Sequence, residues 1–173
     1  MHAEWTAPQV DRPDGSLTAP EHELLAGYLQ FYRTTLLYKC AGLTAEQLAT
    51  RPSPPSNLSL LGLIRHLTKV ERIWFRIHLA DDPAEPLFAP ELGKDADFEL
   101  IDPADAQAAY EGLIHEWKLS DEAAAGRSLD ERFTFKDTES TLRMIYIHLI
   151  GEYARHCGHA DFLREQLDGT TGA

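Results

Sequence analysis

The sequence predicts an all-α protein, a single four-helix bundle with short additional helices and a long connecting loop. Two observations carry this prediction. Apolar residues recur at helical spacing in four long stretches, and segments rich in proline and glycine separate these stretches. No internal repeat or low-complexity tract is evident. With 173 residues, 43% of them hydrophobic, the chain has enough apolar content for one sizeable core.

The N-terminal part of the chain is expected to be an irregular arm over residues 1–18, because residues such as Pro8 and Gly15 interrupt regular structure. The first long helix is predicted at about residues 21–41, where apolar side chains recur at helical spacing. Gly42 marks its end.

Two capping signals place the next elements. Thr44 and Gln47 stand at the ends of a T-x-x-Q capping box, which predicts a short helical turn. Asn57 or Ser59 can cap the second long helix, whose apolar pattern continues to about Ala80.

A long loop able to cover one end of the bundle is predicted after this helix. The breakers that mark the loop are Pro83, Pro86, Pro90 and Gly93. Asp102 then provides a cap and Pro103 the first position of the third helix, which is expected to end near Ala125.

The last part of the bundle follows. Residues 127–137 allow an extended piece, but the third and fourth helices need no sheet between them. The fourth long helix is predicted from about Glu139 to Leu167. The bundle domain is therefore expected over residues 19–169, with residues 170–173 as a C-terminal tail.

Charge and hydropathy exclude several classes of partner. Sixteen basic residues against 28 acidic ones give a net charge of −12, and no cluster of lysine or arginine is present. Nucleic acid is therefore not expected as a partner, and neither is an anionic membrane surface. No apolar stretch approaches the roughly 20 residues of a membrane span, and the N-terminus lacks the features of a secretory signal. A cytoplasmic location is predicted.

The two cysteines, Cys40 and Cys157, are too few for a disulfide framework and form no C-x-x-C pair. We interpret both as packing residues. Cys157 adjoins His156, but its side chain points about 100° away on a helix, so it is not expected to ligate the same metal.

The stretch that begins at Glu152 and contains His156 and His159 is the best candidate for chemistry. Residues four apart on a helix differ by roughly 40° in direction and about 6 Å in height, so Glu152 and His156 project from one stripe. His148 lies four residues before Glu152 and forms a pair of the same spacing. Such a pair can chelate a divalent ion if a third ligand comes from elsewhere, and His66 on the second helix is the candidate.

A simpler interpretation is that these histidines are surface or core residues with ordinary hydrogen bonds. The surroundings favour the metal hypothesis, because buried ionisable groups are costly unless they are paired or metal-bound. The stripe lies among apolar residues rather than in a charged run. These neighbours are Met144, Ile145, Ile147, Leu149 and Ile150.

Three segments together resemble the DinB-like superfamily, especially its mycothiol-dependent transferase and maleylpyruvate isomerase branch. Residues 38–48 read YKCAGLTAEQL, residues 60–75 read LLGLIRHLTKVERIWF, and residues 148–165 read HLIGEYARHCGHADFLRE. The resemblance spans most of the domain and implies a DinB-like four-helix bundle.

The resemblance also implies a metal triad, with one ligand on the second helix and two, four residues apart, on the last. In this chain the matching residues are His66, Glu152 and His156. Glu152 stands where many DinB-like chains have histidine, an arrangement similar to the isomerase branch. His159 is interpreted as holding a ligand in place or packing, with replacement ligand as the less favoured alternative. His148 becomes the weaker ligand candidate.

Two neutral histidines and one carboxylate would leave a divalent metal with net positive charge and an open position. Zn²⁺ suits this ligand set best, and Ni²⁺ or Fe²⁺ are alternatives. The resemblance implies that a low-molecular-weight thiol, mycothiol in the nearest branch, binds as thiolate and attacks a small electrophile.

The sequence therefore predicts a metal-dependent S-transferase. Two alternatives stay open: a metal-dependent hydrolase, and a non-catalytic metal-binding or stress-related dimerisation module. The expected partners are the small thiol and the electrophile, with a homodimer possible. Arg155 and Arg164 are candidates to steer an anionic substrate, although solvated helix surface is the simpler interpretation. Tyr153 and Trp74 are interpreted as core aromatics.

Overall fold

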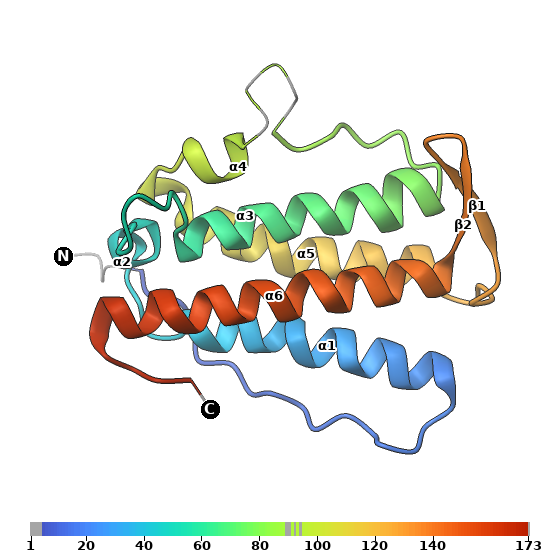
Figure 1. Cartoon of the computed structure of the whole chain (residues 1–173), viewed down its shortest axis with the longest axis horizontal. Helices are drawn as coiled ribbons and strands as arrows, with labels where there is room; N and C mark the ends of the chain where they lie inside the picture. Colours follow the sequence, from blue (N-terminus) through green and yellow to red (C-terminus); the bar gives the residue numbers. More distant parts are fainter. Residues whose placement is uncertain (1–4, 89–90, 92, 94, 173) are drawn as a thin grey trace.

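The computed structural model describes residues 5–88, 91, 93 and 95–172. The fold is predominantly helical, as predicted, and four long helical segments lie side by side (Figure 1). The elements are α1 (Glu21–Cys40), α2 (Ala45–Ala49), α3 (Leu60–Glu71), η1 (Arg72–Leu79), α4 (Ala96–Glu99), η3 (Pro103–Asp105), α5 (Ala106–Ala124), β1 (Arg132–Phe135), β2 (Thr138–Thr141) and α6 (Leu142–Asp168). Within the described residues, no helix is long and apolar enough to cross a membrane.

Both capping signals are confirmed. The Thr44 side chain accepts a hydrogen bond from the Gln47 backbone, and the Gln47 side chain accepts one from the Thr44 backbone, so α2 begins with a complete capping box. Ser59 rather than Asn57 caps α3, because its hydroxyl accepts the Gly62 N–H at 3.0 Å.

The N-terminal segment contains no helix between residue 5 and the start of α1. It is nevertheless attached to the fold. Ala7 exchanges backbone hydrogen bonds with Leu43 and Gly42, at 2.9 and 2.8 Å. The Trp5 ring packs edge-on against Tyr110 of α5, with 5.9 Å between centroids. Residues 1–4, which the arm prediction includes, lie outside the described residues.

The second long helix ends at the predicted place, with Ala80 as its C-terminal cap, but its second half is not α-helical. Over Arg72–Leu79 the backbone forms a π-helix, in which hydrogen bonds reach five residues back. The Ala80 N–H, for example, donates to Phe75 O at 3.1 Å. Apolar spacing does not distinguish these two helix types, so the sequence predicted one continuous α-helix.

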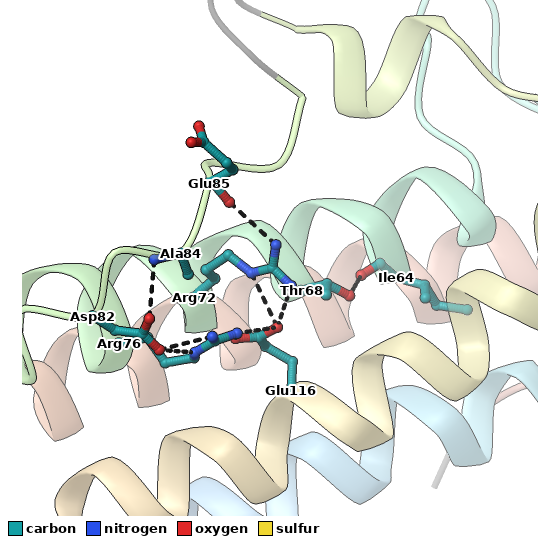
Figure 2. A network of polar contacts seen from close by, with 8 residues as sticks. All are labelled: Ile64, Thr68, Arg72, Arg76, Asp82, Ala84, Glu85 and Glu116. Atoms are coloured by element: carbon teal, nitrogen blue, oxygen red, sulfur yellow. Dashed lines mark hydrogen bonds and ion pairs between the residues drawn. The ribbon is translucent and has the colours of Figure 1, made fainter.

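Two arginines of η1 bind one buried carboxylate of α5 (Figure 2). Arg72 donates to Glu116 at 2.8 Å and Arg76 donates to it at 3.1 Å, while the Glu116 side chain is only 1% exposed. Arg76 also donates to Asp82 at 2.7 Å, and Arg72 to the Glu85 carbonyl at 3.2 Å. Through these hydrogen bonds, η1 holds the segment that contains Asp82 and Glu85 and is itself held against α5.

The predicted long loop contains a short helix that the sequence analysis did not find. This helix, α4, packs on α3 (Figure 1). Pro90, one of the predicted loop markers, lies outside the described residues. The third helix begins as predicted: Asp102 accepts the Ala104 N–H at 2.9 Å, and Pro103 opens the 3₁₀ turn η3 that leads into α5.

A two-stranded antiparallel sheet connects α5 to α6. Its first strand, β1, lies within residues 127–137, where the sequence allowed an extended piece, although the two helices were not expected to need a sheet between them. Lys136 and Asp137 form the turn, with φ values of +47° and +64°. Two consecutive left-handed residues match the twist of a hairpin. The fourth long helix begins at Leu142 instead of about Glu139, because residues 138–141 pair in the sheet and Thr141 caps the helix.

A buried polar network lies inside the apolar core and touches all four long segments. Arg33 of α1 donates twice to Glu71 of α3, at 2.7 and 2.8 Å. Tyr153 of α6 donates to the same carboxylate at 3.0 Å, and the Trp117 indole of α5 donates to the Tyr153 hydroxyl at 2.8 Å. Arg33 is 2% exposed and Glu71 is fully buried. Burial of these charges is tolerated because each is hydrogen-bonded.

Candidate metal centre

Three side chains selected from the sequence converge where α3 meets α6. One potential ligand atom each from His66, Glu152 and His156 lies within 4.8 Å of the others. His66 Nε2 is 3.6 Å from Glu152 Oε2, and His156 Nε2 is 3.5 Å from the same oxygen. The two imidazole rings are 4.7 Å apart, centroid to centroid.

The local structure explains this convergence. Glu152 and His156 are four residues apart on α6, and this spacing places them on one face of the helix, as predicted. His66 lies in the middle of α3, and α3 packs against α6. The side chains are 15%, 9% and 18% exposed for Glu152, His156 and His66. The cluster is therefore largely buried, with a small part of each side chain exposed to solvent.

The second ring nitrogen of His66 has a partner that the sequence analysis missed. His66 Nδ1 lies 2.8 Å from Oδ2 of Asp97, which belongs to α4, and Lys69 Nζ donates to the same oxygen at 2.9 Å. Burial alone would raise the pKa of Asp97, but the hydrogen bonds from His66 and Lys69 outweigh it and lower the pKa to about 2. Asp97 is thus an anion at neutral pH.

The second ring nitrogen of His156 also has a partner. His156 Nδ1 lies 3.2 Å from His159 Nδ1, so the two imidazoles share a hydrogen bond. Burial and the nearby His66 lower the pKa of His156 to about 4, although the Glu152 carboxylate opposes this. The ring is therefore neutral at pH 7, which is the form that ligates a metal. This geometry fits the interpretation that His159 holds a neighbour in place.

The other candidates lie outside the cluster. The His148 ring packs against Trp74, with 4.7 Å between centroids. Cys157 donates its thiol hydrogen to the Tyr32 carbonyl at 3.5 Å, away from the triad. Arg155 is 64% exposed and is not one of the converging residues, but it donates to Glu152 Oε1 at 3.2 Å and so contacts the cluster.

Two more of the sequence candidates have structural partners. Arg164 donates to the backbone carbonyls of Lys39 and Ala41, both at 2.9 Å, and pairs with Asp168. Tyr153 belongs to the buried core network. Arg164 therefore links α6 to the C-terminal end of α1, and Tyr153 links α6 to α3 and α5.

The arrangement is chemically suited to a divalent ion. Two imidazole nitrogens and one carboxylate oxygen face a common point, and the opposite nitrogen of each imidazole is occupied by another side chain. Two nitrogens and one oxygen from three residues are a donor set typical of catalytic zinc sites, where the remaining position stays open. The residues present therefore fit a metal.

Comparison with known protein families decides the family. The sequence profile of the mycothiol S-transferases matches residues 24–169. The chain belongs to the mycothiol S-transferase family. Membership confirms the resemblance read from the sequence and implies a low-molecular-weight thiol as cosubstrate. No curated protein and no solved structure gives a significant match to the chain.

The region matched to the mycothiol S-transferases includes the three converging residues and also Asp97. The sequence carried no spacing signal that joins Asp97 to His66, because their contact depends on how the long loop folds back onto α3. A carboxylate in a loop between two helices becomes a candidate only when a histidine with a free ring nitrogen is known to lie beneath it.

Proposed function

We propose that the chain is a metal-dependent mycothiol S-transferase. His66, Glu152 and His156 hold a divalent ion, and the protein transfers the sulfur of a mycothiol-like thiol to a small electrophile. The observation that carries this proposal is the convergence of three ligand-type atoms within 4.8 Å in a chain of this family.

Zn²⁺ suits two imidazoles and one carboxylate best, with Ni²⁺ or Fe²⁺ as alternatives. A bound divalent ion would stabilise the thiolate form of the cosubstrate at neutral pH, as it does for bound water. An imidazole that ligates a metal adds no charge, whereas a ligating carboxylate adds one negative charge. The triad thus leaves a +2 ion with a net charge of +1, which favours an anionic sulfur.

The protein residues around the triad orient the ligands. Asp97 and His159 engage the Nδ1 atoms of His66 and His156, which keeps the two Nε2 atoms directed at Glu152. In the reaction the thiol sulfur loses its proton and forms a new bond to carbon. The electrophile either takes up a proton after addition or releases a leaving group with its electron pair.

We also infer that the four long segments form the DinB-like bundle as one domain over residues 19–169, with residues 1–18 as an arm and residues 170–173 as a tail. A cytoplasmic setting is consistent with a thiol cosubstrate and with two free, buried cysteines, Cys40 and Cys157. A second copy of the chain as partner stays a prediction.

The test is to purify the protein without a His tag and to measure its bound metals by elemental mass spectrometry. We expect near-stoichiometric metal in the native protein and its loss in folded His66→Ala and Glu152→Ala variants. His148→Ala is the matched control, since this histidine lies one turn from Glu152 on the same helix and contacts Trp74 instead. Metal absent even after loading with Zn²⁺, Ni²⁺ or Fe²⁺ would sink the proposal.

Assays with and without thiol then separate the alternatives. A transferase consumes the electrophile only when the thiol is present and yields a thioether or an isomer. Turnover with water alone would favour the hydrolase, and bound metal without any turnover would favour the non-catalytic module.

A further inference from the structure

The short helix α4 supplies two of the side chains that surround His66. Asp97 Oδ2 lies 2.8 Å from the Nδ1 atom of the imidazole, and the Phe98 ring stacks on it with 4.9 Å between centroids and 29° between planes. Asp97 is only 1% exposed. His66 is therefore held from one side by a hydrogen bond and from one face by an aromatic ring, both delivered by the same four-residue element.

The backbone of α4 is fixed to the neighbouring elements. Arg51 donates to the carbonyls of Phe98 and Glu99, at 2.7 and 2.9 Å. Gly62 of α3 leaves room for the Phe98 ring. Arg51 and α3 hold α4 from two separate parts of the chain. The fold itself therefore fixes the position of Asp97 beside His66.

The chemistry of this contact sets the direction of the hydrogen bond. A carboxylate only accepts, and Lys69 Nζ donates to the same Asp97 oxygen at 2.9 Å. The proton between His66 and Asp97 must therefore belong to His66 Nδ1. In the neutral ring the lone pair is then on Nε2, which is the nitrogen directed at Glu152.

We propose that Asp97 is a positioning residue that fixes His66 as the Nδ1–H tautomer and aims its Nε2 lone pair at the metal centre, with Lys69 offsetting the buried negative charge. A carboxylate behind a ligating imidazole also makes the imidazole a stronger donor. The consequence for metal affinity rests on the proposed function, whereas the tautomer can be measured without any metal.

His156 provides an internal comparison. Its Nδ1 faces His159, an imidazole, instead of a carboxylate. The two metal-facing histidines are thus supported differently, one by a carboxylate with a lysine beside it and one by a second imidazole. Loss of Asp97 is expected to affect His66 alone.

The first experiment records two-bond ¹H–¹⁵N spectra of protein labelled with ¹⁵N-histidine, in the presence of a chelator. A His66→Gln variant assigns the His66 signals. We expect a single Nδ1–H tautomer for His66 in the native protein and in the control variant Glu99→Gln, which removes one exposed charge from the same helix. In Asp97→Ala, His66 should become a mixture of tautomers while His156 does not change.

Asp97→Asn is the second variant, because it keeps an acceptor oxygen and fills the same space if Asp97→Ala fails to fold. It should retain the Nδ1–H tautomer. Zn²⁺ affinity is then measured by competition with a chelating dye. We expect a loss of about 10- to 100-fold in Asp97→Ala, a smaller loss in Asp97→Asn, and none in Glu99→Gln.

Mixed tautomers in the native protein, or variants at residue 97 that bind Zn²⁺ as tightly as Glu99→Gln, would overturn the role of Asp97. A pure Nδ1–H tautomer that is lost in Asp97→Ala, in a protein that binds no Zn²⁺, would instead overturn the proposed function and leave the orienting role of Asp97 intact.

Discussion

The Phe98 ring of α4 packs against the backbone of Gly62 on α3, so closely that a Cβ at residue 62 would stand 3.1 Å from Phe98 Cδ1. The same Cβ would lie 3.2 Å from the Ser59 hydroxyl that caps the helix. These contacts are tighter than ordinary van der Waals separations. A side chain at residue 62 would therefore require Phe98 and Ser59 to shift by a few tenths of an ångström.

We expect Gly62→Ala to be less stable than its matched control, Gly112→Ala in α5. Replacing a helical glycine with alanine normally stabilises by about 0.5–1 kcal/mol. A Cβ at residue 112 would meet nothing within 4 Å, so the control should show this gain, whereas at residue 62 the methyl group must displace Phe98. Denaturant unfolding measures the free energy of unfolding of both variants. Equal gains would show that α4 can move away from residue 62 without loss of stability.

The ion pair of Arg33 and Glu71 should behave as a buried pair. Arg33→Met leaves an unpaired carboxylate in the core, which is expected to cost about 3–5 kcal/mol of unfolding free energy. The control is Arg132→Met, because Arg132 pairs with Glu139 on the surface, where the side chains are 69% and 70% exposed. That loss should be about 0–1 kcal/mol. Similar losses in the two variants would contradict the assigned burial.

The carboxylate of Glu116 should control the order of the segment after η1. Glu116→Gln keeps the shape but removes the charge shared by Arg72 and Arg76, with an expected cost of about 1–3 kcal/mol. Amide exchange near residue 85 should become faster, because Arg72 holds the Glu85 carbonyl. Glu122→Gln on the exposed side of α5 is the control, with an effect within about 0.5 kcal/mol. Unchanged amide exchange would show that the Glu116 carboxylate does not control the order of this segment.

Stability should fall at alkaline pH because of the two thiols. Burial raises the pKa of Cys40 and of Cys157 to about 12, from 9.0. Between pH 9 and 12 the unfolded chain releases thiol protons that the folded chain keeps, so the contribution is present below pH 9 and is lost as the pH rises through this window. Unfolding at pH 8 and pH 10.5 measures the drop. A Cys40→Ala/Cys157→Ala variant should show a smaller drop, and an identical one would exclude the thiols as its source.

Features that depend on local sequence were predictable. The capping box at Thr44 and Gln47, the Ser59 cap and the Asp102 cap each involve residues two or three apart, and local hydrogen bonds determine them. That Glu152 and His156 share one face of the helix likewise follows from helix geometry, whereas the preference for this pair over His148 and Glu152 came from the family resemblance.

Features that depend on the folding back of distant segments were not predictable. The hairpin before α6 requires Lys136 and Asp137 in left-handed conformations; aspartate is among the residue types enriched there, but lysine gives no such signal. Asp97 meets His66 only because α4 returns to α3. His66 was the candidate third ligand before the family resemblance was considered, and the resemblance then selected it. Spacing within one helix cannot specify which part of another helix it faces, so its position opposite α6 was a hypothesis.

The buried network of Arg33, Glu71 and Tyr153 has a geometric consequence for the metal centre. Tyr153 follows Glu152 directly on α6, and Glu71 lies on the same helix as His66. Sliding α6 by one turn along α3 would move its side chains by about 5.4 Å and would break the bond from Tyr153 to Glu71. The core network therefore fixes the longitudinal register at which the carboxylate of one helix meets the imidazole of the other.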